Sequence, residues 1–192
     1  FHTSLWPAEL MGVGSAFMEL FAGDEVPLIL PFDVPANQFM NLEGEKISGS
    51  RNWAVWGRDA LTRYDPDALR YYLTVNMPEA KDSDWDWSEF VARNNNELVA
   101  TWGNLANRVL SFCYKNWDGC VPDVEVDALR EIDRDLLTVI ENGFNTVGAE
   151  LEAVRLRLAL GEAMKLATAV NQYLDHTAPW STIKTDRDAA SK

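Results

Sequence analysis

The chain has 192 residues, 47% of them hydrophobic, and a formal net charge of −13 at pH 7. This length suits one large or two small packed domains, and no apolar run approaches the roughly 20 residues that a membrane-spanning helix needs. With 30 Asp and Glu against 17 Lys and Arg, the composition excludes a general nucleic-acid-binding protein, because such proteins neutralise phosphates with positive charge, and any RNA contact has to be local.

The cysteines and the first residues of the sequence indicate where the protein is found in the cell and whether the sequence is a section of a longer protein. Cys113 and Cys120 are too few for a disulfide framework, and no C-x-x-C motif indicates zinc. The sequence shows no basic region followed by an apolar run and a cleavage site, as a secretory signal would. We therefore predict a cytoplasmic protein with two buried free thiols and no metal site. Because the sequence begins with Phe1 inside an apolar segment, we expect a section of a longer protein.

Residues 1–58 mix helical and extended signals. The segment "WPAELMG" begins like a helix with Pro7 near its first turn. Residues 26–48 are rich in proline and in short apolar runs, which are typical of strands and loops. This mixture indicates an α/β part of the chain.

One loop in this part, "EGEKISGSRNW" at residues 43–53, is unusual in so acidic a chain. It sets Lys46 and Arg51 around two glycines and two hydroxyls, Ser48 and Ser50. Ordinary surface loops also carry lysine and glycine, so the composition of the loop alone favours an ordinary loop.

From Asp59 onward, apolar residues recur with helical spacing. A helix begins at Asp65 and Pro66 and presents Leu69, Tyr72 and Leu73 on one face. Three longer helices follow, joined by residues 116–126 and by the region of Gly148. Their apolar positions, in chain order, are Leu98, Trp102, Leu105, Val109 and Phe112; Leu129, Ile132, Leu136, Ile140, Phe144 and Val147; and Leu151, Val154, Leu158, Val170 and Leu174. Three antiparallel helices with short connections predict a bundle, to which a fourth helix can add beyond the end of the chain.

Two polar or aromatic features remain outside this apolar pattern. Opposite the stripe on the first long helix, Thr101, Asn104, Arg108 and Ser111 share a face that carries no acidic residue. Asn and Arg offer hydrogen-bonding groups for a base edge or a phosphate, but most such faces are simply solvated. Trp180 follows a helix end at Pro179, where an indole either caps a core or stacks on a flat ligand, and core capping is the commoner case.

Six segments together resemble the methionyl-tRNA synthetases in order and spacing. They are "FHTSLWPAELMG", "EGEKISGSRN", "PDALRYYL", "DSDWDWSEFV", "WGNLANRVLSF" and "APWSTIK". The resemblance extends over essentially the whole chain, and its most specific part is "WGNLANR" followed by "APW". It implies a mainly α fold in which a helical anticodon-binding bundle is preceded by a truncated α/β, Rossmann-type remnant of the catalytic domain.

The resemblance assigns residues 43–53 to the loop that closes over ATP in class I synthetases. Lys46, Ile47, Ser48, Gly49 and Ser50 then bind ATP, with Lys46, Ser48 and Ser50 as catalytic groups. Negative charge builds on the phosphate oxygens as pyrophosphate leaves, and a lysine with hydroxyl donors stabilises that transition state. Gly49 departs from the family pattern, which has a second lysine there. Either Lys46 acts alone or with help from Arg51, or the loop is weaker.

The same resemblance assigns two further sets of residues. Phe1 and His2 match the pair that lines the methionine pocket, where an aromatic wall suits a thioether. Asn104, Arg108 and Trp180 match the residues that read the anticodon of tRNA(Met), the last by stacking on a base. We expect these three side chains to cluster at one end of the bundle, with the indole at least partly exposed.

The implied parts are residues 1–58 as the end of the catalytic domain, 59–94 as a helical connecting region and 95–192 as the anticodon-binding domain. Neither of the two histidines, His2 and His176, lies in an H-x-G-H motif. We therefore expect the parent protein to attach methionine to tRNA(Met) with ATP and Mg²⁺, and this section to be inactive alone. The alternative is a noncatalytic helical module that binds tRNA or a protein.

Overall fold

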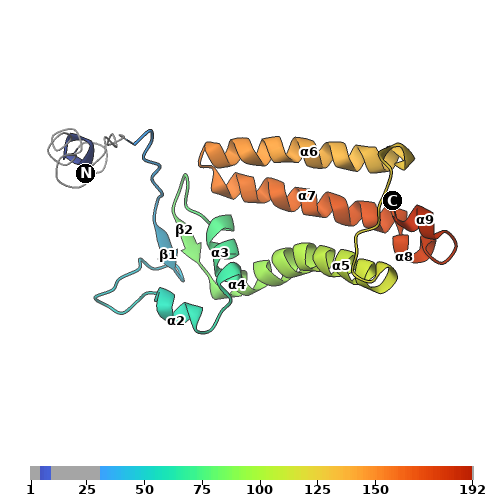
Figure 1. The fold of residues 1–192 in the computed structure, drawn as a ribbon. Coiled ribbons are helices and arrows are strands. Elements are labelled where there is room, and N and C mark those ends of the chain that lie inside the picture. Colours follow the sequence, from blue (N-terminus) through green and yellow to red (C-terminus); the bar gives the residue numbers. More distant parts are fainter. Residues whose placement is uncertain (1–4, 10–30, 192) are drawn as a thin grey trace, which may run out of the picture. The chain divides into compact units, whose positions relative to one another are not determined.

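The computed structural model describes residues 5–9 and 31–191 (Figure 1). The chain divides into two compact units, residues 1–36 and 37–192, which are described separately. In the first unit, residues 5–9 are helical, as the sequence predicts. The elements of the second unit are, in chain order, β1 (Met40–Leu42), α2 (Gly57–Leu61), α3 (Pro66–Val75), β2 (Ser83–Trp85), α4 (Trp87–Arg93), the π-helix η1 (Asn94–Gly103), α5 (Asn104–Trp117), the 3₁₀-helix η2 (Val126–Ala128), α6 (Glu131–Glu152), α7 (Leu156–Thr177), α8 (Pro179–Thr182) and α9 (Arg187–Ser191).

The second unit is mainly helical, so the predicted fold class is confirmed at that level. Residues 95–175, all of which are described, contain no strand. The strands β1 and β2 form a small parallel sheet in which Met40 pairs with Ser83 and Leu42 with Trp85. The crossover between these strands contains α2 and α3.

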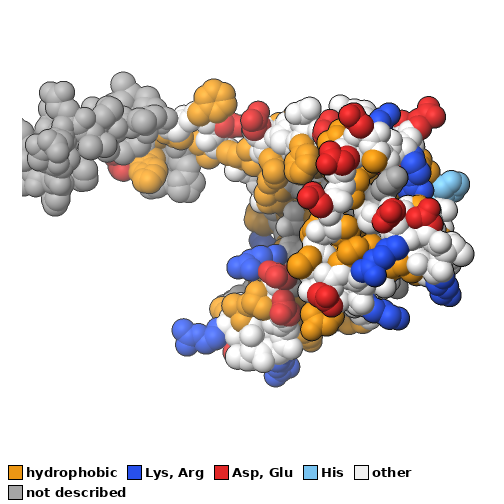
Figure 2. All heavy atoms as spheres, turned by 45° about the vertical axis from the view of Figure 1, so that its right-hand side comes forward, with side chains coloured by type: hydrophobic (Ala, Val, Ile, Leu, Met, Phe, Trp, Pro, Cys, Tyr) orange, Lys and Arg blue, Asp and Glu red, His pale blue; other side chains and the backbone are white. Residues whose placement is uncertain are grey.

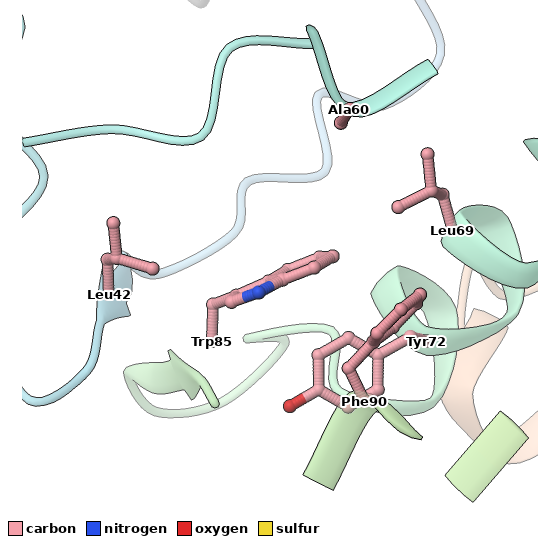
Figure 3. Packing of buried hydrophobic residues seen from close by; sticks show 6 residues of the cluster. All are labelled: Leu42, Ala60, Leu69, Tyr72, Trp85 and Phe90. Carbon is pink, nitrogen blue, oxygen red and sulfur yellow. The ribbon is translucent and has the colours of Figure 1, made fainter. Parts of the chain in front are cut away.

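An aromatic core holds the sheet against α2, α3 and α4 (Figure 3). Its buried members are Leu42, Ala60, Leu69, Tyr72, Trp85 and Phe90. The Trp85 ring centroid lies 4.9 Å from that of Tyr72, edge to face, and 5.4 Å from that of Phe90, stacked. Such aromatic pairs add stability beyond the area that they bury. Since Leu42 ends β1, the loop that follows starts from a rigid base.

The start of α3 follows the sequence prediction. Asp65 caps the helix by accepting a hydrogen bond from the Asp67 backbone N–H at 2.8 Å, and Pro66 occupies the first turn. Tyr72 is fully buried. Leu73 lies one turn from Leu69, on the same face as predicted, but it is 44% exposed.

The first long helix of the bundle is not α-helical from its start. Residues 94–103 form the π-helix η1, whose turns take more residues than α-turns, so the side chains advance differently around the axis. Trp102, predicted to lie in the core, is 54% exposed. Thr101, predicted to share a face with Arg108, lies against α7, where its backbone carbonyl accepts a hydrogen bond from Asn171 Nδ2 at 3.0 Å. Asn171 also accepts a hydrogen bond from Arg108.

Helices α6 and α7 form an antiparallel hairpin, and η1 and α5 pack beside α7 (Figure 1). Gly148, predicted near the connection, lies inside α6, and the chain turns at residues 153–155, where Val154 adopts a φ of 55°. The close approach of the two helices requires Gly143, because a Cβ there would lie 2.5 Å from the Leu166 side chain. Phe144 was predicted to face inward, but its side chain is 73% exposed.

The prediction of two buried thiols is wrong for one of them. Cys113 is half-buried on α5, whereas Cys120 is exposed in the connection that follows α5. Both are free thiols in the structure.

A buried carboxylate joins the start of α6 to the end of α7. Asp133 Oδ1 accepts hydrogen bonds from the Tyr173 hydroxyl at 2.6 Å and from Arg130 Nη2 at 2.7 Å. Asp133 Oδ2 accepts from Arg130 Nε at 3.0 Å and from the Arg130 backbone N–H at 2.8 Å. Burial disfavours the charged form, but the bonds from Arg130 and Tyr173 outweigh it and lower the Asp133 pKa to about 2.

Replacing Asp133 with asparagine is expected to lower the free energy of unfolding by about 2 kcal/mol at pH 7, the equivalent of the pKa shift. Because the folded pKa is lower than the unfolded value of 3.8, this stabilisation is present above pH 4 and is lost as the pH falls toward 2. Urea denaturation of the parent and the Asn variant between pH 7 and pH 2 measures both effects. Asp135→Asn, at an exposed position on α6, is the control. A stability difference that does not shrink below pH 4 would contradict the assignment.

Candidate functional site

Arg108 and Trp180 are in contact where α5 meets the end of α7. The Arg108 Cζ atom lies 4.5 Å from the centroid of the Trp180 ring. Arg108 is held from α7 by two acceptors, Asn171 Oδ1 at 3.2 Å and Asp175 Oδ1 at 2.6 Å. The guanidinium is therefore clamped between α7 and the indole. A cation over an indole face is an attractive arrangement in its own right.

The chain direction changes sharply just before Trp180, and this change places the indole. Ala178 ends α7 in the left-handed region with a φ of 42°, and its N–H donates to the Leu174 carbonyl at 2.9 Å. Pro179 then starts the short helix α8, whose second residue is Trp180. The Trp180 side chain remains 38% exposed. The expectation of a partly exposed indole is confirmed.

Asn104 is the first residue of α5 and is exposed. It lies four residues before Arg108, which is one helical turn, so the two residues share a face of α5. Ser111, predicted on the same face, is exposed and its hydroxyl lies 3.2 Å from Asn107 Oδ1. The predicted polar face therefore exists on α5 from Asn104 onward.

Sequence reasoning missed two members of this cluster, Asn171 and Asp175. They are four residues apart on α7, so they present adjacent acceptors to Arg108. Arg has five N–H donors, and the two hydrogen bonds named above leave three for another acceptor. The Arg108 side chain is 20% exposed and the Trp180 side chain is partly exposed beside it. An indole and a guanidinium in contact are the groups on which proteins stack and hydrogen-bond a nucleobase.

The second candidate site is the loop at residues 43–53, which folds as a closed turn. Ser48 and Trp53 exchange backbone hydrogen bonds at 2.8 and 2.9 Å. The Trp53 indole N–H donates to the Leu42 carbonyl at 3.1 Å and thereby ties the turn to the end of β1. The hydroxyls of Ser48 and Ser50 lie 3.2 Å apart. The turn is thus anchored at its base while its tip remains exposed.

Two cations belong to this loop. The Lys46 Nζ atom lies 5.6 Å from the centroid of the Phe39 ring. Arg51 Nη2 donates to the Lys46 carbonyl at 3.1 Å, so the arginine folds back toward the lysine. Two cations and two hydroxyls on one turn are groups that can bind phosphate oxygens.

Charge on the surface is mixed rather than segregated. Figure 2 shows acidic and basic side chains interspersed on one face of the molecule, with apolar side chains exposed between them. Contacts to a polyanion on this face would have to be local, as the composition implies. In the part of the chain that the structure describes, no group of three or more His, Cys, Asp and Glu could hold a metal ion. None of the described helices is long and apolar enough to cross a membrane.

Phe1 and His2, predicted to line a methionine pocket, lie outside the described residues.

Comparison with known proteins decides the family. Residues 1–110 match the family model described as tRNA synthetases class I (M). The chain belongs to the methionyl class I tRNA synthetases. Residues 121–192 of this synthetase chain match the model described as the anticodon binding domain of methionyl tRNA ligase. The resemblance found in the sequence motifs is therefore confirmed.

Curated synthetases share up to half of their residues with this chain over the aligned part. Methionine–tRNA ligase from Roseiflexus castenholzii is 50% identical over 191 residues, which is 100% of this chain and 30% of that protein. The ligase from Pyrococcus abyssi is 44% identical over 97% of this chain and 25% of its own length. The chain thus spans about a third or less of the length of these synthetases.

Solved synthetase structures have the same fold. Mycobacterium tuberculosis methionyl-tRNA synthetase bound by methionyl-adenylate superposes with a TM-score of 0.78 at 26% identity, covering 99% of this chain and 35% of that one. A second structure of that synthetase in complex with methionyl-adenylate gives a TM-score of 0.79 at 28% identity, with the same coverage.

Proposed function

We propose that this chain is a section of a methionine–tRNA ligase. It carries the loop that closes over ATP, and it reads the anticodon of tRNA(Met). The whole enzyme joins methionine to tRNA(Met) with ATP and Mg²⁺ in the cytoplasm. The section alone is inactive, because its relatives are about three times longer and it carries no H-x-G-H motif. Identity of 50% to a ligase over the whole chain favours this function over a noncatalytic module.

We divide the chain into three parts according to the proposed binding sites that each part carries. Residues 1–58 are the end of a Rossmann-type catalytic domain, with Phe1 and His2 in the methionine pocket. Residues 59–94 connect the catalytic domain to the anticodon-binding domain at 95–192. In support, Figure 1 draws the loop after β1 and the helix α8 at opposite ends of the second unit, so one section can serve an active site and an anticodon.

The observation that carries the anticodon assignment is the Arg108 guanidinium on the Trp180 indole, one helical turn from Asn104. Anticodon bases are splayed out of their loop, and proteins read them by stacking and by hydrogen bonds to their edges. Trp180 supplies the stacking surface, Arg108 supplies donors, and Asn104 supplies a donor and an acceptor together. Asp175 and Asn171 position Arg108 for this task.

In the loop, Lys46, Ser48 and Ser50 act on the phosphates of ATP, with Ile47 and Gly49 forming the backbone between them. The methionine carboxylate attacks the α-phosphate and pyrophosphate leaves, so negative charge accumulates on phosphate oxygens. A cation and two hydroxyls on a turn stabilise this charge more strongly in the transition state than in the ground state.

Replacing Asn104 with alanine in the full-length ligase tests the anticodon assignment. We expect the affinity for tRNA(Met) to fall by about 1 to 3 kcal/mol, the cost of leaving a base edge unpaired. Equilibrium binding of tRNA(Met) with its CAU anticodon measures the loss. Asn107→Ala, three residues further along α5 and also exposed, is the matched control and should bind as the parent does. Equal losses for the two variants would refute the role of Asn104.

A further inference from the structure

The loop at residues 43–53 begins with a turn whose backbone is left-handed at two successive residues. The Leu42 N–H donates to the Glu45 carbonyl at 2.8 Å, and the Glu45 N–H donates to the Leu42 carbonyl at 3.0 Å. Between them, Glu43 has a φ of 52° and Gly44 a φ of 79°. A type I′ turn requires this geometry, but glutamate rarely adopts it. Contacts from outside the turn therefore have to stabilise it.

The segment formed by β2 and the start of α4 supplies those contacts. The Gly44 nitrogen donates to the Asp84 carboxylate and lies 2.9 Å from each of its two oxygens. The Glu43 N–H donates to the Trp85 carbonyl at 3.0 Å. The Glu43 side chain accepts a hydrogen bond from the Trp87 N–H through Oε1 at 3.1 Å. Both left-handed residues are thus bonded to groups outside the turn.

The Asp84 carboxylate acts on the residue of the turn that packing restrains least. Gly44 is exposed, and apart from its chain neighbours no described atom lies within 4 Å of the place that a Cβ would take. Glycine also has more accessible backbone conformations than any other residue. A hydrogen bond to a charged acceptor is stronger than one to a neutral acceptor. The backbone conformation of Gly44 therefore depends strongly on Asp84.

Asp84 itself belongs to a rigid part of the fold. It is the middle residue of β2, and its neighbour Trp85 is 5% exposed in the aromatic core (Figure 3). Leu42, from which the turn starts, belongs to the same core. Lys46 follows Gly44 by two residues, so a change of φ at Gly44 displaces Lys46. The turn therefore joins a fixed core to the exposed part of the loop.

We propose that Asp84 is a positioning residue for adenylate formation, because its carboxylate fixes the turn from which the loop at residues 43–53 extends Lys46. This inference rests on the proposed ATP-closing function of that loop. Asp84 acts through the Gly44 N–H and not on a reacting atom. A displacement of about 1 Å in a group that acts on the reacting atoms can cost about 10²-fold in rate, so the direction of the turn affects the chemical step.

The test measures adenylate formation by the full-length ligase with Asp84→Ala and with Asp84→Asn. We expect Asp84→Ala to lower the rate at saturating ATP and methionine by at least about 10-fold, the contribution of one hydrogen bond to a charged group. Its affinity for tRNA(Met) should match that of the parent. Asparagine keeps one oxygen that can accept from the Gly44 N–H, so Asp84→Asn should recover most of the rate. A rate in Asp84→Asn as low as that in Asp84→Ala would contradict the proposed bond.

Asp82→Ala is the matched control. Asp82 also accepts a hydrogen bond from a backbone N–H, that of Phe39 at 3.0 Å, but this bond lies ahead of β1 and away from the turn. Thermal denaturation should show similar losses of stability in Asp82→Ala and Asp84→Ala, while Asp82→Ala keeps the parent rate. Equal losses of rate in the two variants would indicate a general structural role and would overturn the inference.

A second pair of variants decides the question even if Asp84→Ala does not fold. Valine is disfavoured at the φ of 79° that Gly44 adopts, whereas asparagine enters the left-handed region readily. We expect Gly44→Val to slow adenylate formation as Asp84→Ala does, and Gly44→Asn to stay near the parent rate. The losses of Asp84→Ala and Gly44→Val should not add in the double variant, because both disrupt the same hydrogen bond. A parent rate in Gly44→Val, or additive losses, would refute the role of the turn.

The outcomes separate this inference from the proposed function. A slow Lys46→Ala variant with an unimpaired Asp84→Ala variant overturns the role of Asp84 and leaves the loop assignment standing. If Lys46→Ala is as fast as the parent, the loop assignment itself is wrong, and the inference falls with it.

Discussion

The ligase in which Lys46 is replaced by alanine is expected to form methionyl-adenylate about 10²- to 10³-fold more slowly, the cost of removing one donor from a transition-state oxyanion. The reason is that Lys46 would bind phosphate oxygens whose negative charge grows as pyrophosphate leaves. Methionine-dependent exchange between ATP and pyrophosphate measures this step. The affinity of the Lys46→Ala variant for tRNA(Met) should stay unchanged. Figure 1 draws the loop at the other end of the second unit from α8, where the proposed anticodon site lies.

Lys81→Ala provides the control for this measurement. Lys81 is also exposed, and it lies outside the loop at residues 43–53. The control variant should exchange pyrophosphate at the parent rate. An unaltered rate in Lys46→Ala would mean that the loop does not act on the phosphates of ATP.

Replacing Trp180 with alanine is expected to weaken binding of tRNA(Met) by about 1 to 3 kcal/mol, or roughly five- to 150-fold, the contribution of a base stacked on an aromatic ring. The substitution also removes the surface on which the Arg108 guanidinium rests. Arg108 keeps its bonds to Asp175 and Asn171, so its donors stay near their present place. Equilibrium binding measures the loss, and thermal denaturation of the same variant checks that the bundle still folds.

Trp102→Ala is the matched control for Trp180→Ala. Trp102 is 54% exposed on η1, so it is also a partly exposed tryptophan of the helical part. Trp102 is not among the proposed anticodon-binding residues, and its removal should leave tRNA affinity within the error of the parent. A comparable loss in both variants would indicate a general effect of removing indoles.

Helical periodicity was sufficient to predict the long helices, but it did not predict correctly which side chains of each helix face the core. The residues of α5, α6 and α7 recur with a spacing that only helices explain, and these helices exist. The π-helix η1 could not be predicted, because it changes the number of residues in each turn and leaves no mark on the apolar pattern. Trp102, predicted to lie in the core, is instead exposed on η1.

The spacing of apolar residues also could not predict which residues pack closely between helices. Gly143 lies on the inner face of α6 because Leu166 occupies the space that a side chain would take, whereas Phe144 points outward. A local pattern that counts large apolar residues favours Phe144 and ignores Gly143. Only the separation between α6 and α7 distinguishes the two.

The candidate sites were predicted in part. Motif resemblance indicated Asn104, Arg108 and Trp180, and the structure brings Arg108 onto Trp180. The acceptors that hold Arg108, Asn171 and Asp175, are more than 60 residues away in the chain and carry no motif of their own. Such long-range partners follow from the packing of α5 against α7, which a single sequence does not specify.

The same limit applies to the loop at residues 43–53. The residue types that suit a phosphate were evident from the sequence. The closure of the turn by Ser48 and Trp53, and the fold of Arg51 back to Lys46, depend on backbone geometry. The sequence alone therefore leaves open whether Lys46 acts alone or with help from Arg51.

The most direct test of the proposed function is a thermodynamic cycle of tRNA binding. It compares the full-length ligase with its Trp180→Ala variant, each against tRNA(Met) carrying CAU and against the same tRNA with a changed anticodon. We predict that Trp180→Ala costs about 1 to 3 kcal/mol with the CAU anticodon and nearly nothing with the changed one, because the second complex already lacks the stacked base. Equal losses with the two tRNAs would contradict the assignment and would mean that Trp180 supports the fold without reading the anticodon.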